Sequence, residues 1–201
     1  MGTLVIACGA LARELLEIVA VNRLDDVTVE CLPVGLHNRP KDIPAAVAER
    51  IERARGRYDR IFIGYADCGT GGLLDRLLDD LHADGLVVER LPGAHCYEFY
   101  ATTPVFESIH DADPRNFYLT DYLVRHFDRV VMVGLGLDRH PELRDTYFGN
   151  YRTVIHLAQT EDVALTAMGR AAADKLGLEY RYELVGYGDL APSIISLGEA
   201  V

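Results

Sequence analysis

The segment "RIFIGYADCGTGG", residues 60–72, joins a strand pattern to a glycine-rich turn that carries a cysteine. Its first part, "RIFIG", predicts a buried strand, because the run is short, apolar and ended by glycine. The segment "LVIACGAL", residues 4–11, repeats this arrangement, with Cys8 where the strand pattern gives way to glycine. Two of the four cysteines therefore follow strands directly, and the ends of these strands are the place to look for a site.

Strand and helix patterns alternate on both sides of this segment. The expected strands are residues 3–8, 28–35, 60–66 and 86–91. The expected helices between them, with apolar residues at helical spacing, are residues 10–22, 42–57 and 72–85. A β-α-β-α-β-α-β order predicts an α/β fold with a mainly parallel sheet and helices on both faces. We expect the flavodoxin-like strand order 2-1-3-4.

The second half of the chain has a less regular pattern. Residues 97–128 are rich in aromatic side chains and predict helices and loops. Further strands are expected at residues 129–136, 152–158 and 179–186, with a helix at 161–177 that ends at a glycine. The chain is thus expected to form one α/β domain over residues 1–201, with two fused α/β halves, 1–125 and 126–201, as the alternative.

Composition limits the classes of function. Of the 201 residues, 49% are hydrophobic and 25% are charged, which is typical of a folded domain. The net charge of −11 argues against nucleic acid or an anionic membrane as a partner, because both attract basic surfaces. No apolar run approaches the ~18–20 residues that span a bilayer, and no basic segment resembles a signal peptide. We expect a cytoplasmic protein with reduced thiols.

Three cysteines follow strands that are neighbours in the expected order. Cys8 ends the first strand, Cys68 follows the third and Cys96 follows the fourth. Because ligands of open parallel sheets bind at the carboxyl ends of the strands, we expect these thiols to converge there. Gly9 and Gly69 would let backbone N–H groups approach the bound group. Cys31 lies inside the second strand and is expected to be a packing residue.

Three converging thiolates could form either of two kinds of metal site. In the first, which we favour here, they hold a [4Fe–4S] cluster with one open iron. In the second, Cys8, Cys68, Cys96 and His95 bind zinc, although the closely spaced CxxC pairs of zinc knuckles are absent. The plain alternative is that the cysteines are unrelated small residues at strand ends.

The segment "LHNRPKDIP", residues 36–44, places polar residues directly before a helix. Arg39 and the helix N-terminus together favour an anion, with His37 or Asn38 as a second contact. We therefore expect Arg39 to bind a carboxylate or phosphate beside the metal. The alternative is a surface ion pair with an acidic residue, which contributes little.

Three polar residues of the second half have no clear catalytic pattern. Tyr151, His156 and Asp162 are plausible as core or helix-capping residues. No Ser-His-Asp or paired-carboxylate arrangement emerges from their spacing.

Together, "ACGAL", "LHNRP", the turn "GYADCG" and the element "AHCYEF" resemble the bacterial and archaeal domain-of-unknown-function family 1638. The resemblance covers most of the chain and is strongest over residues 3–100. It implies that Cys8, Cys68 and Cys96 act together, and that His37, Asn38 and Arg39 belong to the same site. It also implies a link with corrinoid-dependent methyl-transfer systems, and hence a corrinoid methyltransferase as a partner.

Two functions are therefore expected from the sequence. The first is a cluster protein whose open iron serves electron transfer or binds a small anionic substrate. The second is a structural or interaction module in which zinc ties three loops together and no catalysis occurs. Whether the protein is an enzyme stays open at this point.

Overall fold

The computed structural model describes residues 2–198, and the chain divides into two compact units. The first unit runs up to Cys96 and also includes the segment that begins at Leu190, whereas the second unit is Tyr97–Asp189. Each unit contains one sheet, and all the described strand pairs are parallel. The predicted α/β class with a parallel sheet is confirmed.

The first sheet has four strands in the order β2-β1-β3-β4, which confirms the predicted order. The strands are β1 (Thr3–Cys8), β2 (Val27–Leu32), β3 (Arg60–Gly64) and β4 (Val88–Arg90). Every residue of β1 is buried, as expected for a central strand of a parallel sheet that is covered on both faces. Cys8 is the last residue of β1, so it lies at the carboxyl edge.

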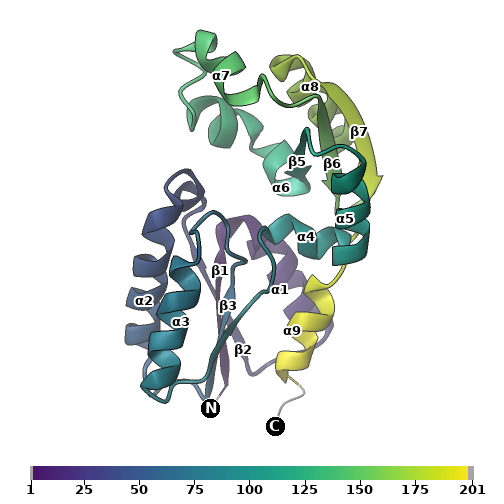
Figure 1. Ribbon diagram of the computed structural model, residues 1–201. Coiled ribbons are helices and arrows are strands. Elements are labelled where there is room, and N and C mark those ends of the chain that lie inside the picture. Colours follow the sequence, from purple (N-terminus) through teal and green to yellow (C-terminus); the bar gives the residue numbers. More distant parts are fainter. Residues whose placement is uncertain (1, 199–201) are drawn as a thin grey trace. The chain divides into compact units, whose positions relative to one another are not determined.

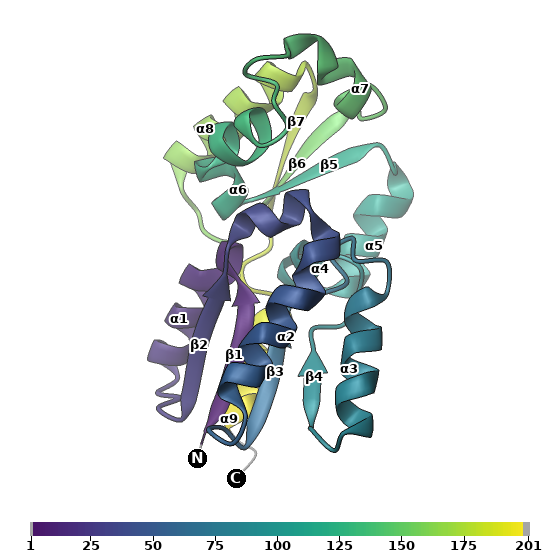
Figure 2. The same cartoon turned by 90° about the vertical axis from the view of Figure 1, so that its left-hand side faces the viewer.

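Helices cover both faces of this sheet, as Figures 1 and 2 show. They are α1 (Ala12–Val21), α2 (Ile43–Ala54), α3 (Leu73–Ala83) and α9 (Leu190–Gly198). α2 packs with α3 on one face, and α1 packs with α9 on the other. Each helix buries residues spaced three or four apart, such as Val47 and Ile51 of α2. The buried faces of these helices fix them against the sheet, and the loops that join strands to helices at the carboxyl edge are held in place at both ends.

The second sheet has three strands in chain order, β5-β6-β7. The strands are β5 (Asn116–Thr120), β6 (Thr153–Ala158) and β7 (Glu179–Leu184). The helices near it in the chain are α4 (Cys96–Ala101), α5 (Thr103–Ala112), α6 (Asp121–Arg125), α7 (Arg144–Phe148) and α8 (Val163–Leu176). Side chains of α6, α7 and α8 form one core, and those of α4 and α5 belong to another.

The strand predicted at residues 129–136 is wrong. Residues Asp128–Val133 form a π-helical segment that follows α6. The apolar run "RVVMV" has the composition of a strand, but its burial follows a helical period. Val124, Phe127 and Val131 are all buried in one core, at spacings of three and four residues. Tertiary packing on a helical face thus decides the conformation of this segment.

The two units also divide the chain at other positions than residue 125. β5 lies within residues 97–128, where the sequence predicted only helices and loops. β5 pairs with β6, and the second unit begins at Tyr97. Within residues 2–198, no helix is both long and apolar enough to cross a membrane.

Candidate metal centre

Three metal-binding side chains meet at the carboxyl edge of the first sheet. One donor atom each from His37, Cys68 and Cys96 lies within 4.8 Å of the other two. They come from loops after three strands: β2 leads into the 3₁₀ turn η2 (Val34–Asn38), β3 into the Cys68 turn, and β4 into α4. Cys68 is buried, whereas His37 and Cys96 are partly exposed. The group is therefore accessible from solvent while one thiol is held inside.

Backbone hydrogen bonds join the Cys68 turn to the loop after β4. The N–H of Cys68 donates to the carbonyl of Ala94 at 2.9 Å, and that of Asp67 donates to Gly93 at 3.1 Å. These bonds bring the Cys68 and Cys96 Sγ atoms to 2.9 Å from each other. Cys68 has φ +49°, a left-handed conformation that is uncommon outside glycine. Such strain persists only where the surroundings hold it, which is typical of functional sites.

Asp67 fixes the rest of the turn. Its carboxylate accepts hydrogen bonds from the Thr70 hydroxyl at 2.6 Å and from the N–H groups of Gly71 and Gly72 at 3.1 and 2.8 Å. The bond from Thr70, together with those from backbone N–H groups, lowers the pKa of Asp67 against the effect of burial. The turn that presents Cys68 is thus closed by its own side chains before any ligand binds.

Cys8 contacts the imidazole of the group. Its Sγ lies 3.5 Å from Nδ1 of His37 and accepts a hydrogen bond from the N–H of Ala10 at 3.4 Å. The His37 ring also stacks on Tyr65, with centroids 6.1 Å apart. Cys8 and Tyr65 therefore hold the orientation of His37, whereas Cys8 itself is not one of the three convergent donors.

Charge is unevenly shared within the group. Burial opposes the charged form of His37, but its hydrogen bonds to Cys68 and Cys8 outweigh this and raise the pKa to about 10. The hydrogen bond from Cys96, followed by the effects of His37, lowers the pKa of Cys68 to about 5 against burial. The Cys68 thiolate and then burial raise the pKa of Cys96 well above its usual value. These shifts favour a thiolate at Cys68 and an imidazolium at His37 beside the thiol of Cys96.

The hydroxyl of Tyr65 completes the surroundings. Tyr65 is fully buried, and its hydroxyl has no hydrogen-bond partner among residues 2–198. Burial, followed by the charges of Cys8, Cys96 and Cys68 and by a close approach of the hydroxyl to the Cys8 side chain, raises the pKa of Tyr65. A buried hydroxyl without a partner is costly, and in a native structure it calls for an explanation such as an ion or ligand.

The other residues predicted for this site lie as follows. His95 is exposed and outside the group of donors, next to Cys96 in the chain. Asn38 and Arg39 are exposed, and Arg39 Nε lies 3.6 Å from the Asp42 carboxylate. This is the surface ion pair that the sequence left as an alternative, and anion binding by Arg39 stays a prediction.

The glycines beside the cysteines make close contacts within the protein. A Cβ on Gly9 would lie 3.1 Å from the carbonyl oxygen of Leu32, so its absence lets the ends of β1 and β2 approach. Gly69 has φ +82° and lies against Pro40, which brings the Cys68 turn next to the segment after His37. Both glycines shape the site, and their binding of a cofactor stays a prediction.

Cys31 is placed apart from the other cysteines. In the pairing of β1 with β2, Cys31 lies beside Ala7 and Cys8 lies beside Leu32. Since side chains alternate along a strand, Cys31 and Cys8 belong to opposite faces of the sheet. Cys31 is a partly exposed free thiol outside the donor group.

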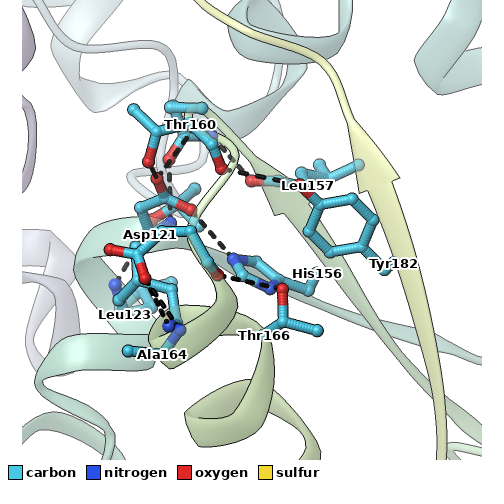
Figure 3. Close-up of polar contacts among 12 residues, drawn as sticks. Asp121, Leu123, His156, Leu157, Thr160, Ala164, Thr166 and Tyr182 are labelled. Atoms are coloured by element: carbon cyan, nitrogen blue, oxygen red, sulfur yellow. Dashed lines mark hydrogen bonds and ion pairs between the residues drawn. The ribbon is translucent and has the colours of Figure 1, made fainter.

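A second polar cluster lies in the second unit, at the carboxyl end of β5 (Figure 3). The Asp121 carboxylate is 2.9 Å from Nε2 of His156 and accepts bonds from the Thr160 hydroxyl at 2.7 Å and N–H at 3.1 Å. Nδ1 of His156 is 3.0 Å from the Tyr180 hydroxyl. Asp121 and His156 are 1% and 0% exposed. These two side chains are shielded from solvent and hydrogen-bonded, whereas Thr160 and Tyr180 at the margin of the network are partly exposed.

His156 and Asp162 match their expected structural roles. His156 is a core residue, and the Asp162 side chain caps α8 by accepting from the N–H groups of Ala164 and Leu165. The sequence did not single out Asp121. Its signal was the pair Thr120–Asp121 at the end of an aromatic strand segment, the edge where parallel sheets gather polar groups.

Comparisons with known proteins give one match. A family model described as "Protein of unknown function (DUF1638)" matches residues 31–194. In the comparisons with curated proteins and with solved structures, nothing matches. The matched range contains His37, Cys68 and Cys96 and begins after Cys8.

Proposed function

We propose that this chain, which belongs to the DUF1638 family, is a metal-binding protein whose ion is held by His37, Cys68 and Cys96. The observation that carries the proposal is the convergence of one imidazole and two thiols within 4.8 Å, at the edge where parallel sheets bind ligands. Thiolate and imidazole together suit zinc and other thiophilic ions. The buried hydroxyl of Tyr65 beside this group supports a bound ion or ligand.

The spacing of the donors favours one ion over an iron–sulfur cluster. Each thiolate of a [4Fe–4S] cluster binds a different iron, so its sulfurs must lie further apart than two donors of one ion. Two sulfurs on a tetrahedral zinc are ~3.8 Å apart, given a Zn–S distance of ~2.3 Å. The Cys68 and Cys96 sulfurs lie 2.9 Å apart. To bind zinc, the two sulfurs would have to move apart by only about 1 Å. To bind a cluster, they would have to move apart further.

Three protein donors leave a fourth position to be filled. Zinc sites with three protein ligands usually keep this position for water or substrate, and closed structural sites fill it with a fourth side chain. The Tyr65 hydroxyl supports the open arrangement, since a small anionic substrate or water there would give it a partner. Cys8 is the residue that could close the site instead. The link with corrinoid-dependent methyl transfer stays an expectation from the family resemblance.

The deciding experiment is elemental analysis of the full-length protein purified without oxygen and without added chelator. We expect about one equivalent of zinc per chain and no absorption typical of an iron–sulfur cluster. Cys68→Ser and Cys96→Ser should each lose the zinc. The matched control is Cys31→Ser, which changes a thiol outside the donor group and should keep the zinc.

Other results would identify other sites. About four irons per chain with visible absorption would establish the cluster and overturn the single-ion proposal. Metal-free protein with a Cys68–Cys96 disulfide, detected by mass spectrometry, would instead indicate a redox pair. Protein that stays metal-free and reduced after incubation with zinc would overturn the proposal altogether.

A further inference from the structure

The second unit contains a cavity that the metal centre does not use. Its volume is about 450 Å³, which lies within the usual range for small-molecule sites. It lies between α8 and the helical region formed by α6 and the π-helical segment Asp128–Val133. Its lining residues are Val124, Arg125, His126, Phe127, Asp128, Arg129, Met168, Ala171, Ala172 and Lys175.

The charge of this cavity is opposite to that of the chain. The lining contains three cations, Arg125, Arg129 and Lys175, and one carboxylate, Asp128, so its net charge is +2 with His126 neutral. The whole chain carries −11. Burial, followed by the charges of Arg129 and Arg125, lowers the pKa of His126, as a positive environment should. A ligand with two negative charges would neutralise the lining.

The three cations differ in how they are held. Lys175 pairs with Asp128 at 2.5 Å, and Arg129 donates to the Tyr122 hydroxyl at 3.1 Å. Arg125 is partly buried and makes no ion pair within residues 2–198. Its guanidinium therefore keeps its capacity for a two-pronged interaction with a phosphate or carboxylate.

Apolar side chains make up the rest of the lining. Val124, Phe127 and Ala172 belong to the core, and Met168 is 43% exposed beside Ala171 on α8. An exposed methionine is a flexible surface that adapts to apolar ligands. An inorganic ion alone would leave this part of the cavity uncovered.

We propose that this cavity binds a small organic phosphate, with its dianionic group at Arg125, Arg129 and Lys175 and its apolar part against Met168 and Ala171. A phosphomonoester carries close to two negative charges at neutral pH, which matches the net charge of the lining. The proposal concerns residues of the second unit only and does not depend on the metal centre.

The test is calorimetric titration of the full-length protein with three probes at neutral pH and low salt. Phenyl phosphate has both the dianion and the apolar ring, inorganic phosphate has only the anion, and benzyl alcohol has only the ring. We expect phenyl phosphate to bind roughly tenfold more tightly than inorganic phosphate, because its ring adds apolar contact, and benzyl alcohol to give no measurable binding. Raising the salt concentration should weaken binding.

Variants locate the binding. Arg125→Gln should weaken phenyl phosphate binding roughly tenfold or more, the effect of losing a charge-assisted hydrogen bond. Arg144→Gln is the matched control, since Arg144 lies in the same unit, pairs with Asp145 and does not line the cavity. Cys68→Ser should bind phenyl phosphate like the parent, which separates this site from the metal centre. Circular dichroism checks that each variant is folded.

Four results would overturn the proposal. They are the absence of phenyl phosphate binding, equal binding of benzyl alcohol, equal binding of inorganic phosphate, and unchanged binding by Arg125→Gln. The third would remove the organic part of the ligand, and the fourth would move the site elsewhere.

Discussion

Each of the two sheets has a histidine near its carboxyl edge, but the surroundings of the two rings differ. His156 in the second unit is fully buried, and both its nitrogens have partners, Asp121 and Tyr180. His37 in the first unit is partly exposed, lies with two thiols whose Sγ atoms are 2.9 Å apart, and stacks on a tyrosine whose hydroxyl has no hydrogen-bond partner among residues 2–198. A polar network whose hydrogen bonds are all formed stabilises the fold. A polar group that lacks a hydrogen-bond partner favours the binding of an ion or ligand.

The largest expected effect is the loss of Asp121. Asp121→Ala removes one partner of a buried pair and leaves His156 and Thr160 without it, which should cost about 3–5 kcal/mol of the stability of the second unit. Hydrogen exchange of residues 116–125 and 153–160 measures this, and the metal content should not change. Asp128→Ala, at an exposed ion pair, is the control. An equally small effect of both variants would show that the network is not what stabilises this unit.

The next effect concerns the role of Cys8. If Cys8 only orients His37, Cys8→Ser should keep the full metal stoichiometry and weaken zinc binding about 10- to 100-fold, as expected for a partner of a ligating histidine. Competition with a chelator of known affinity gives this value. Loss of stoichiometry would show that Cys8 is the fourth ligand and that the site is closed.

The stabilisation that Asp121 contributes to the second unit should depend on pH. Burial would raise the pKa of Asp121, but hydrogen bonds to His156 and Thr160 outweigh it and lower the pKa below its ordinary 3.8. Because the folded pKa is the lower one, the stabilisation is present above the ordinary pKa and is lost as the pH falls through the folded pKa. The difference in unfolding free energy between the parent and Asp121→Asn should therefore be constant from about pH 7 to about pH 5 and shrink below about pH 4. A difference that stays constant at acidic pH would contradict this.

The smallest effect compares two tyrosine hydroxyls. Tyr180→Phe removes a hydroxyl bonded to His156 and should cost about 1 kcal/mol. Tyr65→Phe removes a hydroxyl without a partner, so metal-free protein should keep its stability within about 0.5 kcal/mol or gain some. Chemical denaturation followed by hydrogen exchange measures each unit. A clear loss in Tyr65→Phe without metal would mean that this hydroxyl is already satisfied.

Sequence patterns predicted the first unit better than the second for a physical reason. Central strands such as β1 and β3 are covered on both faces, so they are short apolar runs between turns, and their order followed from the β-α alternation. Residues 128–133 have the same composition, but their side chains pack on a helical face with Val124 and Phe127. Composition alone does not distinguish a buried strand from a buried helix.

The candidate site was predictable in part. That Cys68 and Cys96 meet follows from the strand order, because adjacent strands deliver their loops to one edge. The choice of histidine does not follow from spacing. His95 is adjacent to Cys96 but exposed, whereas His37 enters the site through the 3₁₀ turn after β2 and its contact with Cys8. The segment "LHNRP" pointed to His37 through the family resemblance, but the 3₁₀ turn that brings this ring to Cys68 depends on tertiary contacts.

The division of the first unit by the second has a consequence for protein synthesis. α9 buries Leu190, Ile194 and Leu197 and packs on α1, so α1 stays uncovered until the ribosome has passed residues 97–189. All three proposed metal ligands are made before that stretch. An ion captured by the nascent chain would link the loops after three strands while one face of the sheet is still open. The supply of metal during translation would then influence how much of the protein reaches its folded state.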